Sequence, residues 1–261
     1  MDMVDVDFEW FDPQPEVDFH GLKTLCRQLF DSDAEILDLS ALSDLILSQP
    51  TLGSTVKVDG NETDPYAFLT VLNLHEHRGT PVIQTLTQYI ASKAAAIPAL
   101  SQLPSLLDTS SPAQVGLILT ERLINMPSEI IPPMYTMLLE EIEWALNDGE
   151  PYAFTHYLVL SKTYKEVESK LDAEDSRPSK KKRKDASPET FYFHPEDEIL
   201  HKFAVGFSDY PYTHQRDEGS ADSKRVFSDA GIEPQGHLIL IEAGRFKEAV
   251  EALKDYLRQS S

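Results

Sequence analysis

The sequence predicts an α/β fold in which helices flank a mixed and mostly buried central sheet. The first observation is a set of almost uninterrupted apolar runs, which are typical of strands buried on both faces. These runs are Phe68–Leu74, Val115–Leu119, Tyr157–Leu160 and Leu238–Ile241. The second observation is that amphipathic helical patterns lie between the runs. The third is the repeated alternation of strand and helix, which indicates a sheet covered by helices.

The first strand is expected near the N-terminus, where apolar and acidic residues alternate from Val4 to Trp10. A period of two is that of a half-exposed strand, with one face toward the core. The outer face would carry a ladder of three carboxylates: Asp5, Asp7 and Glu9.

Helices are expected where apolar side chains recur every three to four residues. The predicted helical segments are Phe19–Leu29, Ser40–Ser48, Ile83–Ile90, Met134–Leu146 and Phe246–Leu257. Weaker patterns predict further strands at Thr55–Val58, His201–Phe207 and Lys224–Phe227, with a loop at Tyr210–Ser223. Cys26 is the only cysteine and lies in the first helix. It cannot form an intrachain disulfide, and we expect a buried, unreactive thiol.

Residues 165–189 interrupt the alternation of strands and helices. They are polar and rich in lysine, and they contain Pro178 and Pro188. Strand patterns resume after Phe191. We therefore interpret residues 165–189 as a disordered basic loop inserted into a single domain of residues 1–261, and not as a domain boundary.

The chain is very acidic, with 23 Lys and Arg against 44 Asp and Glu, which gives a formal charge of −21. Residues 177–184 contain six of the basic residues and no acid, so the rest of the chain is more acidic still. A body of this charge repels nucleic acid and anionic lipid and attracts basic proteins. We therefore expect no direct binding of nucleic acid. No run of 18 apolar residues is present, so we also expect no membrane span.

The basic run itself consists of five consecutive residues: Lys180, Lys181, Lys182, Arg183 and Lys184. A compact cluster of this kind on a flexible segment is typical of a nuclear import signal. It is also compatible with a loop that is merely soluble, or with weak nucleic-acid binding. The negative charge elsewhere in the chain favours the import signal, and with it a nuclear protein.

The sequence offers no clear catalytic, cofactor or metal site. The loop His75–Pro81 lies between a predicted strand and helix, where phosphates can bind. It contains only Gly79 as a glycine, and Pro81 lacks the N–H that a phosphate would need. His75 and His77 are two residues apart, whereas metal-binding helices place histidines four apart. We predict no catalytic residue, no cofactor and no metal.

Several segments resemble the BCCIP family, and in particular its fungal members. The resemblance lies in the order and spacing of Val6–Pro13, Asp18–Lys23, Gly53–Lys57, Phe68–Leu74, His77–Thr80, Val115–Pro127 and Pro133–Tyr135. It extends over essentially the whole chain. It implies a fold similar to that of the GCN5-related N-acetyltransferases, without their activity. In that fold Phe68–Leu74 would precede the cofactor loop, and the loop His75–Pro81 lacks the glycine-rich acetyl-CoA signature.

The resemblance also implies partners. Fungal members of the family are nuclear chaperones for a basic large-subunit ribosomal protein and assist the nuclear export of a phosphoinositide kinase. These roles imply contact with import and export receptors and shuttling between nucleus and cytoplasm.

Three functions follow as hypotheses. The first is a non-enzymatic acidic chaperone for the basic ribosomal protein, with exposed carboxylates as contributors: Asp5, Asp7, Glu9, Glu140, Glu141 and Glu143. The second is a scaffold or nuclear export adaptor with several partners, including the phosphoinositide kinase. The third is an active N-acetyltransferase, which would have to bind acetyl-CoA near Arg78–Pro81.

Overall fold

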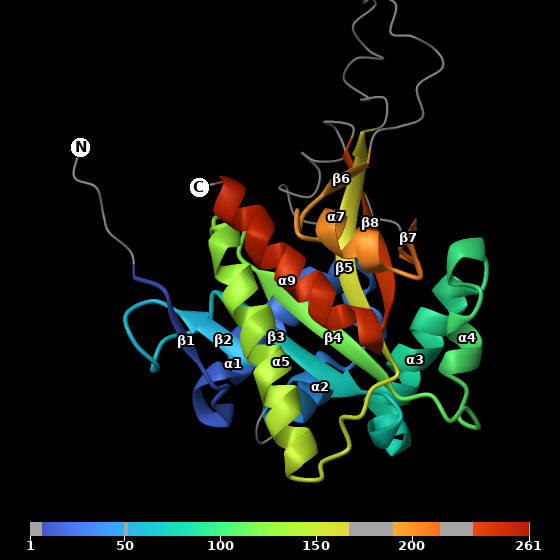
Figure 1. Cartoon of the computed structure of the whole chain (residues 1–261), viewed down its shortest axis with the longest axis horizontal. Coiled ribbons are helices and arrows are strands. Elements are labelled where there is room, and N and C mark those ends of the chain that lie inside the picture. The colour runs from blue at the N-terminus through green and yellow to red at the C-terminus, as the bar shows by residue number, and fades with distance from the viewer. Residues whose placement is uncertain (1–6, 50–51, 167–189, 215–231, 261) are drawn as a thin grey trace, which may run out of the picture.

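The structure is a computed structural model of the chain, and it describes residues 7–49, 52–166, 190–214 and 232–260 (Figure 1). Eight described strands form one mixed sheet in the order β1-β2-β3-β4-β5-β8-β7, and β6 pairs with the outer part of β5. The strands are β1 (Glu9–Phe11), β2 (Ser54–Lys57), β3 (Ala67–Asn73), β4 (Val115–Arg122), β5 (His156–Glu166), β6 (Thr190–Tyr192), β7 (Gly206–Tyr210) and β8 (Ile232–Glu242). The predicted mixed α/β architecture is confirmed.

Helices cover both faces of the sheet (Figure 1). One face packs against α1 (Pro15–Phe30), α2 (Leu39–Leu47), α3 (Pro81–Ala94) and α4 (Leu103–Leu106). The other packs against α5 (Ile131–Asn147), α7 (Asp197–Leu200) and α9 (Ala243–Ser260). In Figure 1, α5 and α9 lie next to each other in front of the sheet, and they are also in contact. Short 3-10 helices complete the described chain: η1 (Asp31–Ile36), η2 (Glu76–Gly79), η3 (Pro98–Leu100), η4 (Ser128–Ile130) and η5 (His201–Phe203).

The central strands are mostly apolar because helices exclude water from both of their faces. Every residue of β3 and of β4 is buried. α1 begins at Pro15, which is favourable in a first helical turn, and it buries the apolar stripe that the sequence predicted. Cys26 lies in this stripe with no exposed surface, as predicted, and burial raises the pKa of its thiol.

β5 and β8 are longer than the strands predicted from their apolar runs. Each has eleven residues, and they pair from His156 opposite Glu242 to Glu166 opposite Ile232. The outer halves of both strands carry polar side chains, so their sequence resembles that of a loop. The predicted loop of residues 165–189 was therefore wrong at its start, because Lys165 and Glu166 belong to β5. Residues 167–189 lie outside the described part of the chain.

The predicted strand at His201–Phe207 is correct only at its end. α7 and η5 precede it, and β7 begins at Gly206 and continues to Tyr210. The predicted strand starts too early because His201–Phe203 form η5, and a short apolar pattern does not distinguish a helical turn from a strand. The predicted strand Lys224–Phe227 lies outside the described residues, as do Val4 and Val6 of the expected first strand.

Candidate functional site

The ends of β4 and β5 form the place where a ligand site would be expected. These two are the parallel pair among the described strands, and their pairing ends at Leu119 opposite Leu160. Both strands continue further, β4 to Arg122 and β5 to Glu166, so their carboxyl ends separate. Ligands of such sheets bind in the crevice beyond the carboxyl ends of the strands.

This position differs from that of the loop His75–Pro81, which the sequence places between a strand and a helix. The loop His75–Pro81 follows β3, and β3 is antiparallel to both of its neighbours. The strand, loop and helix were predicted correctly there, as β3, η2 and α3. This loop does not follow a parallel strand, and the direction of each strand depends on pairing that the sequence does not display.

The crevice between β4 and β5 is filled by residues 193–197, which we call the plug segment. His194 lies between the two strands, with Nε2 3.1 Å from Glu121 Oε1 on β4 and Nδ1 2.9 Å from Ser161 Oγ on β5. Glu196 binds Arg122 through two hydrogen bonds, of 2.5 and 3.1 Å. His194 and Glu196 are both buried. The chain itself therefore occupies the place where a cofactor would enter.

Opposite charges balance within this buried cluster. Lys162 Nζ lies 2.5 Å from Glu121 Oε2 and donates a hydrogen bond to the carbonyl of Gln28. Burial raises the pKa of Glu121, but His194 and then Lys162 outweigh it and lower the pKa to about 2. Burial lowers the pKa of His194, but Glu121 reverses the shift and raises it. Burial raises the pKa of Asp197 to about 6.

Ser161, His194 and Glu121 have the connectivity of a catalytic triad, which makes them the strongest candidate for nucleophilic chemistry. Ser161 Oγ, however, donates a 2.5 Å hydrogen bond to Asp197, and the residue is only 1% exposed. The second oxygen of Glu121 is held by Lys162. The hydroxyl is thus closed off from solvent in this structure, and its hydrogen bonds fasten the plug segment to the sheet.

The loop after β3 uses several of its backbone N–H groups internally. The backbone N–H groups of His75 and Glu76 donate to Asn73 Oδ1, at 2.9 and 3.1 Å. The N–H of Thr80 donates to the carbonyl of His77. These amides are used within the loop itself, whereas a phosphate-binding loop directs them at the ligand.

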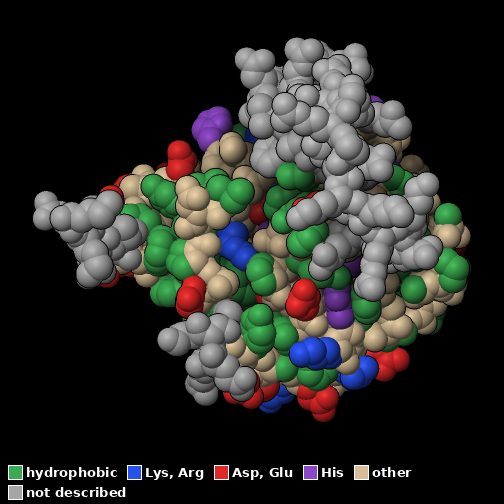
Figure 2. Space-filling view, turned by 90° about the horizontal axis from the view of Figure 1, so that it is seen from above, with side chains coloured by type: hydrophobic (Ala, Val, Ile, Leu, Met, Phe, Trp, Pro, Cys, Tyr) green, Lys and Arg blue, Asp and Glu red, His purple; other side chains and the backbone are tan. Residues whose placement is uncertain are grey.

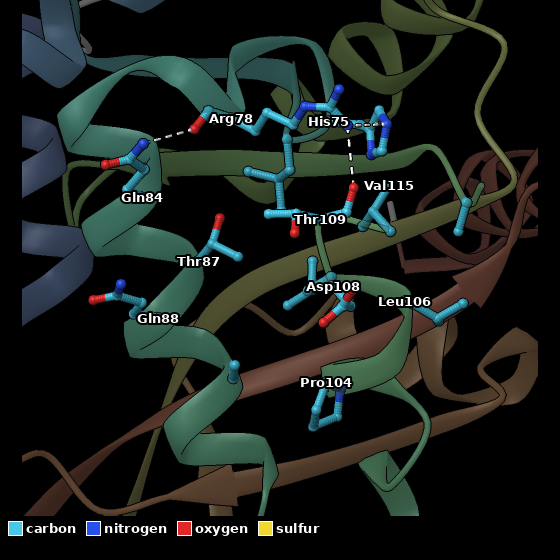
Figure 3. Close-up of a pocket in the computed structure, with 14 residues that line it drawn as sticks. His75, Arg78, Gln84, Thr87, Gln88, Pro104, Leu106, Asp108, Thr109 and Val115 are labelled. Atoms are coloured by element: carbon cyan, nitrogen blue, oxygen red, sulfur yellow. Dashed lines mark hydrogen bonds between the residues drawn. The ribbon is translucent and has the colours of Figure 1, made fainter. Parts of the chain in front are cut away.

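A cavity of about 310 Å³ lies beside this loop (Figure 3). In Figure 3, α3 supplies one wall and residues 104–109 supply the other. Arg78 crosses one end, where its Nη1 lies 2.6 Å from His75 Nε2 and 3.3 Å from the carbonyl of Thr109. These two contacts of Nη1 hold the Arg78 guanidinium at this end of the cavity. The described residues contain no cluster of metal-binding side chains.

The acidic residues proposed for partner binding differ in their exposure: one lies outside the described residues, four are exposed, and one is buried. Asp5 lies outside the described residues, as do Lys180, Lys181, Lys182, Arg183 and Lys184 of the basic run. Asp7, Glu9, Glu140 and Glu143 are exposed.

Glu141 was expected to be exposed, and this was wrong. It is 5% exposed, on the face of α5 that packs against the sheet. Its Oε2 accepts a 2.8 Å hydrogen bond from the N–H of Gly53. Burial raises the pKa of Glu141, the Gly53 hydrogen bond opposes that shift, and Asp12 adds to it.

Most of the negative charge of the molecule lies outside its core. The buried ion pairs are Lys57–Asp18, Arg122–Glu196 and Lys162–Glu121, and each is neutral. Asp33, Glu141 and Asp197 are buried in addition to these pairs, so all but about three units of the formal charge of −21 fall on partly or fully exposed residues or outside the described ranges. On the face shown in Figure 2, acidic, basic and hydrophobic side chains are intermixed, so the acidic surplus is not concentrated on the visible part of that face.

The fold and the site together define a mixed α/β protein with an acidic surface and a strand crevice closed by its own chain. Among the described helices, none is both long and apolar enough to cross a bilayer. The BCCIP family model matches residues 3–200, and the chain belongs to the BCCIP family.

Individual relatives support this assignment over nearly the full chain. Protein bcp1 of Aspergillus fumigatus is 62% identical over 259 residues, which covers 99% of this chain and 89% of the relative. Protein bcp1 of Schizosaccharomyces pombe is 54% identical and covers 97% of this chain and 90% of the relative. The crystal structure of BCP1 from Saccharomyces cerevisiae matches with a TM-score of 0.66 at 27% identity, over 96% of this chain and 89% of that one.

Proposed function

We propose that this BCCIP-family protein is a non-enzymatic acidic nuclear chaperone that binds and shields a basic large-subunit ribosomal protein. The observation that carries the proposal is the formal charge of −21 on a folded body whose internal ion pairs are neutral. The client is suggested by the fungal members of the family that the sequence resembles. A newly made ribosomal protein exposes a cationic RNA-binding surface, and a field of carboxylates attracts and neutralises that surface.

Release of the client follows from the same electrostatics. Ribosomal RNA presents a denser array of negative charges than a protein surface, and it competes for the same cationic side chains. The chaperone would thus protect the client during transport and give it up at the site of ribosome assembly. Shuttling between cytoplasm and nucleus is part of this proposal.

A role without catalysis is supported by the site. The relatives carry the names bcp1 and BCP1, which are not names of enzymes. The plug segment fills the crevice between β4 and β5, and Ser161 is buried under it. Co-expression of the chain with the ribosomal protein, followed by gel filtration, tests the proposal. A soluble complex is expected where the ribosomal protein alone precipitates, and separate elution of the two would contradict it.

Association with the client should depend strongly on salt. Raising the ionic strength from about 0.05 M to 0.3 M is expected to lower the association rate constant about ten-fold, because screening removes long-range attraction. The dissociation rate should change less, since contacts at short range are screened less. Stopped-flow fluorescence measures both constants. An association rate that does not respond to salt would contradict an electrostatic mechanism.

We further propose that Lys180, Lys181, Lys182, Arg183 and Lys184 form the nuclear import signal. Replacing all five with alanine is expected to abolish the nuclear accumulation of a fluorescent fusion, because import receptors bind such clusters through their charge. Lys202, Arg245 and Lys247 are exposed basic residues elsewhere in the chain. Their replacement by alanine serves as the control and should leave accumulation unchanged. Undiminished nuclear fluorescence of the five-alanine variant would remove this proposal.

A further inference from the structure

The C-terminal half of α5 presents an unusual outward face. Trp144 is 62% exposed and Leu146 is 42% exposed. Glu140 and Glu143 are exposed on the same part of the helix, with Glu140 one turn before Trp144. The opposite face of α5 is fully packed in the core: Met134, Tyr135, Leu138, Ile142 and Ala145. We call the four outward residues, together with Asp148 at the end of the helix, the α5 face.

The charges of the α5 face do not serve the stability of the helix. The C-terminus of a helix carries a partial negative charge, which cations stabilise and anions destabilise. The last turn of α5 contains no basic residue, Glu143 lies next to it, and Asp148 is the C-cap. In the sequence, no Lys or Arg occurs between Arg122 and Lys162, whereas six acidic residues do. A cation supplied from outside would meet the helix dipole and these carboxylates together.

Trp144 is available as an anchor. Within the described part of the chain it makes no ring stacking or cation–π contact, and no basic side chain pairs with Glu140, Glu143 or Asp148. Exposed tryptophans are enriched among the residues that dominate the energy of protein interfaces. The indole face is also the best aromatic surface for an arginine guanidinium.

We propose that the α5 face is the docking surface for an arginine- and lysine-rich segment of a basic protein, with one guanidinium stacked on Trp144 and its neighbours paired with Glu140, Glu143 and Asp148. This inference rests on the proposed function and assigns a location to it. Charge complementarity selects the occupant. A second copy of this chain would place acid against acid, and an anionic membrane would meet the same repulsion.

The probe is a 12-residue peptide in which arginine alternates with serine, and a peptide with glutamine in place of arginine serves as its neutral counterpart. Calorimetric titration into the full-length chain measures the affinity at low salt. Trp144→Ala should weaken binding of the arginine peptide about ten-fold, from the loss of the cation–π contact and of buried apolar area. The double variant Glu140→Gln with Glu143→Gln should weaken it by about the same factor. The glutamine peptide should not bind.

Asp59 and Glu62 provide a matched control. Both are exposed acidic residues in the turn between β2 and β3, away from α5. Asp59→Asn with Glu62→Gln changes the net charge by the same amount as the double variant on α5. The affinity for the arginine peptide should stay within about two-fold of the original, because distant exposed charges are screened.

A stability measurement separates binding from folding. Glu143→Gln removes a negative charge close to the helix C-terminus, so the urea midpoint should stay the same or rise while the affinity falls. A variant that merely disturbed the fold would lower both.

Three outcomes would overturn the inference. If the double variant on α5 and the double variant between β2 and β3 weaken peptide binding equally, the overall negative charge binds the peptide and the α5 face does not. The proposed chaperone function would still stand in that case. If the chain self-associates in analytical ultracentrifugation and Trp144→Ala abolishes this, the occupant of the α5 face is a second copy of the chain. If Trp144→Ala binds the arginine peptide with unchanged affinity, Trp144 is not an anchor for it. If neither the peptide nor the ribosomal protein binds the unaltered chain, the proposed function fails as well.

Discussion

Replacing Lys57 with methionine should lower the free energy of unfolding by about 3–5 kcal/mol, because it leaves a buried carboxylate without its partner. Lys57 and Asp18 have no exposed side-chain surface, and Nζ lies 2.6 Å from Oδ1. Nζ also donates to the carbonyl and the Oδ1 of Asn61, at 2.7 and 2.8 Å. Methionine has nearly the same length as lysine, so the loss comes mainly from charge and hydrogen bonding. Urea denaturation followed by circular dichroism measures it.

Lys254→Met is the matched control for this substitution. Lys254 pairs with Glu251 on the surface of α9 at 3.1 Å, and Glu251 is largely exposed. Removing a solvated pair of this kind should cost less than about 1 kcal/mol. The double variant Asp18→Leu with Lys57→Met should recover part of the loss, since it removes both charges. A loss of under about 1 kcal/mol in Lys57→Met would show that the Asp18 carboxylate is not held unpaired in the interior.

Glu121→Gln should have the second largest effect, a loss of about 3 kcal/mol, because it leaves Lys162 and His194 buried without their counter-charge. Glu121 accepts from both, on its two oxygens. The plug segment should then open more often, and hydrogen exchange of residues 193–200 should accelerate. Glu198→Gln, at an exposed position of α7, serves as the control and should leave both measurements unchanged.

The pH dependence of stability gives an independent check on the same cluster. The pKa of Glu121 is lowered from 4.5 to about 2, so its contribution is present above about 4.5 and is lost as the pH falls toward 2. The pKa of His194 is raised from 6.5, so its contribution is complete below 6.5 and is lost as the pH rises through the raised value. Glu121→Gln should flatten both slopes, since Glu121 raises the pKa of His194. If the stability of the variant still changes with pH in the same way, the pH dependence arises from other groups.

The buried elements could be predicted from the sequence, and the partly polar ones could not. β3 and β4 were predicted because burial on both faces leaves a continuous apolar run that any window of the sequence shows. β5 and β8 were predicted only over their apolar halves. Their outer halves are held in place by pairing with each other and with β6, and pairing leaves no local pattern.

The plug segment shows the same limit for the site. Glu121 and His194 are 73 residues apart in the sequence, and His194 and Ser161 are 33 apart. Each is an ordinary polar residue in its own context. The one signal was that Glu121-Arg122 and Ser161-Lys162 lie within two residues of the ends of apolar runs, where strand ends often carry functional side chains.

The sequence by itself determined the acidic character of the protein, its α/β class, the positions of its buried strands and its resemblance to the BCCIP family. The tertiary structure alone decided that β4 and β5 run parallel and separate at their ends, that residues 193–197 fill the gap, and that Glu141 is buried while Glu140 and Glu143 are exposed. The physical reason is that composition and periodicity are properties of neighbouring residues. The occupancy of a crevice and the burial of one glutamate among three depend on which distant segments the fold brings into contact.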